Sequence, residues 1–311
     1  MVDAQDQVYA LTTSPNFAQD GVCFAARQTG LYRSEDSGAT WRLSYGSLQL
    51  DGPLATTAVA VSPAFASDHS VFAGVQGGVM RSVDGGDTWH SALFPSPPPL
   101  VSALVISPNF VHDGTLFAGT LEDGVLCSTD RGSHWTPWNF GLLDRQILSL
   151  AISPDFAQDG TLFAGTESGV YCSTNGGRAW KDIDFADDMA PVLSLTLSPA
   201  YARDGVVFAG TESWGLWRSN DRGRTWTPVD KEAITGPVNG IVCAPTSNAL
   251  PDVLVVLSAT LLVSRDGGQS WATWKADLPI LEGLMAAAAP YGLGADTFIL
   301  VGSADGRVLQ I

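Results

Sequence analysis

The chain has 311 residues, of which 45% are hydrophobic, and its 16 basic residues stand against 32 acidic ones, giving a net charge of −16 at pH 7. A surface this acidic repels nucleic-acid phosphates and anionic membranes, so we expect no nucleic-acid partner. No run of about 18 apolar residues occurs, so we expect no membrane insertion either. Residues 1–6 lack the basic and apolar regions of a signal peptide. The expected location is therefore the cytoplasm, or an extracytoplasmic compartment if a signal peptide has been removed.

Four cysteines are too few for a disulfide framework in a chain of this length. They fall at positions 23, 127, 172 and 243, each inside a segment with the alternation of a strand. Neither the cysteines nor the four histidines form a cluster with metal-ligand spacing. We therefore expect no metal and no cofactor.

The first half of a repeated unit occurs seven times along the chain. It reads VYALTTSPNFAQDGVCFAA at 8–26, VSALVISPNFVHDGTLFAG at 101–119, ILSLAISPDFAQDGTLFAG at 147–165 and VLSLTLSPAYARDGVVFAG at 192–210, with looser copies at 57–74, 238–257 and 282–302. In the copy at 147–165, alternation and turn residues predict an inner strand over 148–153, a turn at 159–160 and a second strand over 161–165. A third strand is expected over 170–173.

An octet closes six of the seven units. The octets are SEDSGATW (34–41), SVDGGDTW (82–89), STDRGSHW (128–135), STNGGRAW (173–180), SNDRGRTW (219–226) and SRDGGQSW (264–271). Their tryptophans recur every 45–48 residues, the length of one four-stranded propeller blade with its turns. Each octet is expected to turn the chain from the third strand into an outer strand.

These periods predict an all-β chain, a single seven-bladed β-propeller over residues 1–311 with four-stranded antiparallel blades. The repeats begin near residues 8, 56, 101, 147, 192, 238 and 283. Since no octet follows the seventh first half, the last blade is expected to be incomplete or closed by a short strand from residues 1–7.

The octets resemble the Asp-box (BNR) repeat, S-x-D-x-G-x-T-W, which is found in sialidases, sortilin, xyloglucanases and photosystem II assembly propellers. The resemblance covers nearly the whole chain and implies the propeller fold. It says little about activity, because that group includes enzymes, receptors and assembly factors.

The octet carboxylates have two interpretations. They are candidates for metal-binding or catalytic groups, or they are acceptors for the amides of their own hairpins, as Asp and Asn are in turns. The fourth octet keeps the acceptor without the charge, which favours the structural role. The residues assigned to that role are Asp36, Asp84, Asp130, Asn175, Asp221 and Asp266, with the tryptophans Trp41, Trp89, Trp135, Trp180, Trp226 and Trp271 packed between strands.

A catalytic function needs charged groups that the repeats do not supply. The residues that strand alternation turns toward the propeller axis carry no charge. A sialidase-like enzyme needs an arginine cluster, an acid and a nucleophile, and a xyloglucanase-like enzyme uses two propellers where this chain has one. Glycoside hydrolysis generally requires two opposed carboxylates, which here would have to come from loops. We therefore expect no enzyme activity, with a carbohydrate-binding or glycoside-hydrolase-like propeller as the alternative.

The face opposite the octets varies from blade to blade and is the expected binding surface. Arg27 replaces the threonine of other repeats, Trp214 is inserted in a tight turn at 212–215, and blade three has a matching insertion at 121–124. The candidate partner-binding residues are Arg27, Glu122, Asp123, Glu167, Asp187, Asp188, Glu212 and Trp214. An indole within an acidic rim fits a protein partner and favours a basic one. The alternative is a solvated loop with Trp214 folded back over a neighbouring blade.

Overall fold

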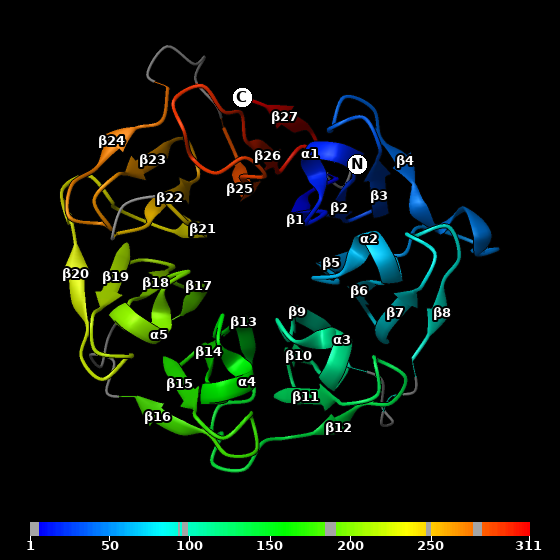
Figure 1. The fold of residues 1–311 in the computed structure, drawn as a ribbon, viewed down its shortest axis with the longest axis horizontal. Helices are drawn as coiled ribbons and strands as arrows, with labels where there is room; N and C mark the ends of the chain where they lie inside the picture. The colour runs from blue at the N-terminus through cyan, green and yellow to red at the C-terminus, as the bar shows by residue number, and fades with distance from the viewer. Residues whose placement is uncertain (1–5, 93, 95–98, 184–190, 247–249, 276–281) are drawn as a thin grey trace, which may run out of the picture.

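Seven small sheets form a ring around a central axis in the computed structural model of the chain (Figure 1). It describes residues 6–92, 94, 99–183, 191–246, 250–275 and 282–311. Within each sheet the strands run antiparallel in chain order from the axis outward. This arrangement confirms the predicted all-β, seven-bladed propeller.

The strands take the same four places in successive blades. The innermost strands are β1 (Val8–Thr13), β5 (Thr56–Val61), β9 (Val101–Ile106), β13 (Ile147–Ile152), β17 (Val192–Leu197), β21 (Val238–Ala244) and β25 (Leu284–Ala288). The second strands are β2 (Cys23–Arg27), β6 (Val71–Val75), β10 (Leu116–Thr120), β14 (Leu162–Thr166), β18 (Val207–Thr211), β22 (Asp252–Leu257) and β26 (Leu300–Ser303). The third strands are β3 (Gly30–Ser34), β7 (Gly78–Ser82), β11 (Val125–Ser128), β15 (Val170–Ser173), β19 (Leu216–Ser219), β23 (Leu261–Ser264) and β27 (Val308–Gln310). The outer strands are β4 (Arg42–Leu43), β8 (His90–Ser91), β12 (Thr136–Pro137), β16 (Lys181–Ile183), β20 (Thr227–Val229) and β24 (Ala272–Thr273).

A single helical turn joins the first and second strands of five blades, where the sequence predicts a plain turn. These helices are α1 (Phe17–Asp20), α2 (Phe65–Asp68), α3 (Phe110–Asp113), α4 (Phe156–Asp159) and α5 (Tyr201–Asp204), and a 3-10 turn lies at Ser44–Ser47. In blade four, the Ser153 hydroxyl donates to Asp159 Oδ2 at 2.7 Å, and the amide of Thr161 donates to the other carboxylate oxygen at 2.8 Å. The same serine–aspartate bond recurs in all five blades, so it fixes this helical turn.

The blades are held together by a phenylalanine-on-glycine contact. The fifth residue of each octet is a glycine with φ between +81° and +95°, and five of these glycines lie against a phenylalanine on the second strand of the preceding blade. A Cβ on Gly177 would come within 2.7 Å of Phe117, and one on Gly223 within 2.6 Å of Phe163. Both phenylalanines are fully buried. The glycine therefore allows both the turn and the close approach of neighbouring blades.

The ring closes through the same contacts between blades seven and one. Gly38 lies against Leu300, which takes the place of the phenylalanine, and Val8 packs on Gly302. In the described residues the seventh sheet has three strands, β25, β26 and β27, as the missing octet leads one to expect. The Gln310 side chain also donates to the carbonyl of Ser37 at 3.2 Å, so packing and this hydrogen bond join blades seven and one in the described part of the chain.

Candidate partner-binding surface on the loop face

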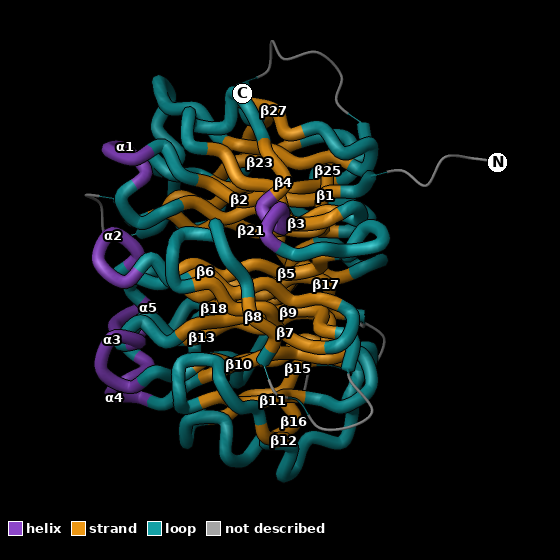
Figure 2. Tube along the Cα trace, turned by 90° about the vertical axis from the view of Figure 1, so that its right-hand side faces the viewer, coloured by secondary structure: helices purple, strands orange, loops and turns teal. Residues whose placement is uncertain are grey.

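The propeller has two faces of different character. The helical turns α1–α5 all lie on one face (Figure 2), and the octets join them there because the amides of Arg131, Gly176 and Arg222 donate to the glycines that end the helical turns. We call this the octet face. The turns between second and third strands and the connections between blades lie at the other ends of the strands, and we call that side the loop face.

The octet carboxylates bind their own hairpins. Asp36 Oδ1 accepts the Ser34 hydroxyl at 2.7 Å and the Thr40 amide at 2.8 Å, and Asn175 Oδ1 accepts the corresponding groups at 3.0 Å and 2.9 Å. The same pair of bonds occurs in the other four octets. The acceptor oxygens are thus engaged inside each hairpin, and a neutral amide serves as well as a carboxylate.

Octet tryptophans lie between neighbouring blades. Trp89, Trp135 and Trp180 are 3–5% exposed, whereas Trp41, Trp226 and Trp271 are partly exposed. The Trp180 indole donates to the carbonyl of Trp138 in the preceding blade at 2.8 Å, and that of Trp89 donates to the carbonyl of Ser44 at 3.1 Å. These two side chains therefore link successive blades directly.

Metal removal should leave the stability of the protein unchanged. Since Asn175 makes the bonds that the aspartates make, the hairpins need an acceptor rather than a cation. No group of three or more potential metal ligands occurs among the residues that the structure describes. Thermal unfolding with and without EDTA checks this, and a fall in Tm of several degrees on adding the chelator would contradict it.

Acid should destabilise the protein between about pH 4 and pH 2 through the octet aspartates. Hydrogen bonds from the Thr40 hydroxyl and amide lower the pKa of Asp36 to about 2. Partial burial raises the pKa of Asp84, but bonds from Thr88 and Ser82 outweigh it and lower the pKa to about 2. Since these pKa values lie below that of an unfolded aspartate, their stabilising effect is present above about pH 4 and is lost as the pH falls through 2.

Urea unfolding from pH 5 to pH 2 measures this loss. Asp84→Asn keeps an acceptor, as Asn175 shows, so the variant should fold and lose less stability on acidification than the original protein. An identical pH profile for the two proteins would contradict the assignment.

Trp214 stands exposed on a fixed turn of the loop face. Its indole is 56% exposed, while its amide donates to the Thr211 hydroxyl at 2.9 Å and its carbonyl accepts the Trp217 indole at 3.2 Å. Gly215 follows at φ +68°, against the backbone of Ile234. The backbone of the turn is thus held by strand residues on both sides, and the ring projects from it.

The corresponding turn of blade three has the same bonds and presents a different side chain. There Thr120 accepts the amide of Asp123 at 2.9 Å and donates to the carbonyl of Gly124 at 2.9 Å, as Thr211 does for Trp214 and Gly215. Asp123 therefore takes the place of Trp214 two blades away. Glu122 and Glu212 are exposed on these two turns.

Blade four has a shorter turn that is tied to the preceding connection. The amide of Ser168 donates to Asp144 Oδ2 at 2.8 Å, and the amide of Gln146 donates to the other oxygen at 2.9 Å. Burial raises the pKa of Asp144, but these hydrogen bonds outweigh burial and lower it. Glu167 is exposed beside Ser168. The three glutamates thus occupy the loop-face turns of three adjacent blades.

Three residues proposed from the sequence lie either apart from the loop-face turns of blades three to five or outside the described residues. Arg27 is at the end of β2 on the opposite side of the ring (Figure 1). Its side chain is 13% exposed, lies 3.6 Å from Asp6 and stacks over Tyr32, so it is engaged within blade one. Asp187 and Asp188 lie outside the described residues.

Two exposed apolar side chains that the sequence analysis missed lie in the connection between blades three and four. Phe140 is 79% exposed and Leu143 is 83% exposed. The Phe140 carbonyl accepts the amide of Trp180, which places Phe140 at the outer rim. Asp144, the residue after Leu143, accepts the amide of Ser168 in the blade-four turn. The run Phe140-Gly141-Leu142-Leu143 is apolar in the sequence, but it does not stand out, since the connections at 92–100 and 278–281 are rich in apolar residues as well.

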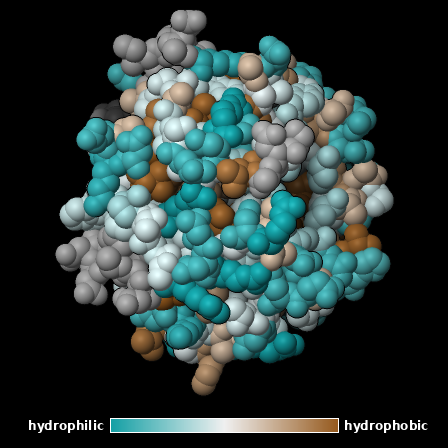
Figure 3. Space-filling model, turned by 60° about the vertical axis from the view of Figure 1, so that its left-hand side comes forward, coloured by the Kyte–Doolittle hydropathy of each residue, from teal (hydrophilic) through white to brown (hydrophobic). Residues whose placement is uncertain are grey.

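The side seen in Figure 3 is mostly hydrophilic, with hydrophobic residues in small, separate groups. That side therefore presents separate apolar side chains rather than a continuous apolar patch. The inner strands carry no charged residue, and all of them belong to the described part of the chain.

Comparisons with known proteins find structural neighbours and no sequence relatives. No family model and no curated protein matches the chain. Among solved structures, the extracellular domain of a putative one-component system from B. thetaiotaomicron shares 15% identity at a TM-score of 0.72, covering 99% of this chain and 38% of that one. An ancestral GH74 enzyme shares 19% identity at a TM-score of 0.73, covering 99% and 45%. YCF48 bound to D1 peptide shares 16% identity at a TM-score of 0.70, covering 99% and 94%.

These neighbours share the propeller fold with this chain, and they include both enzymes and a protein bound to a peptide. The chain spans less than half the length of the first two. In the described residues, none of the helices is long and apolar enough to cross a membrane.

Proposed function

We propose that the chain is a non-catalytic Asp-box propeller that binds a protein partner through the loop face of blades three to five. The observation that carries the proposal is Trp214, an indole 56% exposed on a turn whose backbone is fixed by Thr211 and Gly215. A rigid aromatic side chain loses little conformational entropy on binding, which is why tryptophan is enriched at the centres of protein interfaces.

The surroundings of Trp214 support a protein rather than a small molecule. Exposed carboxylates stand on the same turn, at Glu212, and on the turns one and two blades away, at Glu167 and Glu122. Phe140 and Leu143 add exposed apolar area in the connection between blades three and four. Carboxylates around an aromatic anchor favour a partner with basic residues and speed its association. The structural neighbour bound to a peptide is consistent with this use of the fold.

A glycan is the second candidate, since an exposed indole beside carboxylates also suits a sugar, and GH74 enzymes share the fold. Cleavage of a glycosidic bond generally needs two opposed carboxylates about 5–10 Å apart. The described loop-face glutamates come from separate blades, and the inner strands supply no charge. If the ligand is a glycan, we therefore propose that the protein binds it without cleaving it.

Affinity capture from the native host tests the proposal. The immobilised protein and its Trp214→Ala variant are compared, with bound proteins identified by mass spectrometry and xyloglucan oligosaccharide added in a parallel sample. We expect a protein retained by the original chain and lost with the variant, whether or not the oligosaccharide is present. Equal capture by both chains, release by the oligosaccharide, or hydrolysis of xyloglucan would contradict the proposal.

A further inference from the structure

One position in the third strand differs between blades. The residue before the octet serine is arginine in blades one, two and five, at Arg33, Arg81 and Arg218, and Val263 in blade six, but cysteine in blades three and four, at Cys127 and Cys172. Two of these arginines reach across to the sixth residue of the next octet. Arg33 lies 3.0 Å from Asp87, and Arg81 donates to Ser133 at 3.1 Å.

Where the strand has cysteine, the next octet supplies the arginine instead. The sixth octet residue is Arg178 after Cys127 and Arg224 after Cys172. The third-strand guanidinium of Arg33 is largely buried, whereas the hairpin guanidinium groups of Arg178 and Arg224 are exposed.

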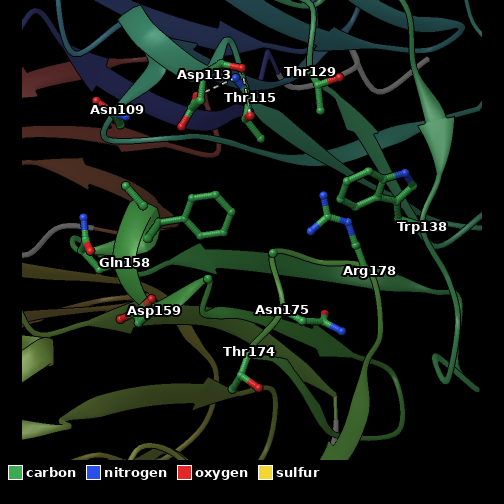
Figure 4. A pocket seen from close by; sticks show the side chains of 14 residues that line it. Asn109, Asp113, Thr115, Thr129, Trp138, Gln158, Asp159, Thr174, Asn175 and Arg178 are labelled. Carbon is green, nitrogen blue, oxygen red and sulfur yellow. Dashed lines mark hydrogen bonds between the residues drawn. The ribbon is translucent and has the colours of Figure 1, made fainter.

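Two neighbouring hollows lie on the octet side of the molecule, with Arg178 in the lining of one and Cys172 and Arg224 in the lining of the other. One of about 520 Å³ lies between blades three and four, and one of about 630 Å³ lies between blades four and five. Asp159 and Thr174 line both, so the two hollows adjoin. Figure 4 shows Arg178 pointing into the first hollow beside Trp138, whose ring centroid is 5.4 Å from the guanidinium carbon.

The positive charges in these hollows have no ionic partner in the described part of the chain. Arg178, Lys181 and Arg224 are exposed and make no ion pair there. Arg222, in the second hollow, donates to the carbonyl of Ala202 at 2.7 Å and remains charged.

The acidic residues that line the hollows leave those cations available. Asp159 is engaged by Ser153 and Thr161, and Asp113 is engaged in the same way by Ser107 and Thr115. Asn175 brings no charge to the first hollow, where the other octets have aspartate. The second hollow has two carboxylates, Asp159 and Asp182, beside its three cations.

We propose that the two hollows form one groove that binds an acidic peptide segment of a protein partner, with Arg178 and Arg224 holding its carboxylates. A guanidinium presents two parallel N–H donors that match a carboxylate, and an exposed pair without an ionic partner among the described residues has few described contacts to give up on binding. Because the cations stand one blade apart in adjoining hollows, a chain with several carboxylates engages both at once. On a protein of net charge −16, the described lining of this groove is richer in cations than the rest of the chain, with four cations and three carboxylates.

This site goes beyond the loop-face function. It lies on the octet side, uses other residues and selects a partner segment of opposite charge. The groove and the Trp214 surface can be tested independently, because Trp214→Ala should leave peptide binding in the groove unchanged.

Fluorescence anisotropy with a labelled hexaglutamate peptide at low salt tests the groove. The variant Arg178→Gln/Arg224→Gln should fold, because Gln269 occupies the same octet position in blade six. We expect saturable binding by the original chain and at least tenfold weaker binding by this variant. The control Arg145→Gln/Arg307→Gln removes two exposed positive charges elsewhere and should change the affinity less than twofold.

Three outcomes would overturn the proposal. They are absence of saturable binding to the original chain, equal weakening in the control variant, and displacement of the peptide by oligogalacturonate or sulfate at lower concentration than by unlabelled hexaglutamate. The last would assign the cations to an anionic glycan or to a free anion. Circular dichroism melting of each variant shows that it is folded.

Discussion

Trp180→Ala should lower the free energy of unfolding by about 3–5 kcal/mol, the range for truncating a large buried aromatic side chain. Trp180 is 5% exposed and packs in one cluster with Phe117, Leu142 and Tyr171, from blades three and four. Its indole also donates to the carbonyl of Trp138, so the substitution removes a bond between blades as well as packed volume.

Urea unfolding at neutral pH measures this change. Trp214→Ala is the matched control, because it removes the same ring from an exposed position and should alter the free energy of unfolding by less than about 1 kcal/mol. A loss of under about 1 kcal/mol for Trp180→Ala would mean that octet tryptophans are not part of the core.

Trp214→Ala should weaken binding of the protein partner by about 2 kcal/mol or more, as removal of a central aromatic anchor does. The backbone bonds of its turn involve Thr211 and the carbonyl of Gly215, so they persist in the variant. The lost affinity therefore reports the ring itself rather than a rearranged loop.

Isothermal titration with the partner recovered by affinity capture gives the difference. Tyr291→Ala is the control, since Tyr291 is another exposed ring, 42% exposed, in blade seven. Equal affinities for the original chain and Trp214→Ala, or an equal loss with Tyr291→Ala, would contradict the role of Trp214.

Most of the scaffold follows from the sequence because its repeats are strict. Comparing seven copies places the strands of blade four within one residue of Ile147–Ile152, Leu162–Thr166 and Val170–Ser173. The helical turns were not predicted, since four residues such as Phe156–Asp159 are too short for helical periodicity to show. They depend on a serine–aspartate bond across six residues, which only the folded turn brings together.

The candidate site was predicted in part, for reasons that the contacts explain. Repeat comparison finds an inserted residue such as Trp214, because an insertion interrupts the period. It cannot find Asp6, which neutralises Arg27, or show that Phe140 points outward, because pairing and exposure are set by chain segments far apart in the sequence. The exchange of arginine between strand and octet is visible in the sequence once the structure shows that the two positions face each other.

Site-specific photo-cross-linking in the native host tests the loop-face proposal most directly. A benzoylphenylalanine replaces Ser213, exposed beside Trp214, in one protein and Ala39, exposed in the octet of blade one, in another. The proposal predicts a discrete protein adduct from position 213 that disappears with Trp214→Ala, and none from position 39. An adduct from position 39 alone, or one from position 213 that persists without the indole, would contradict binding through the loop face.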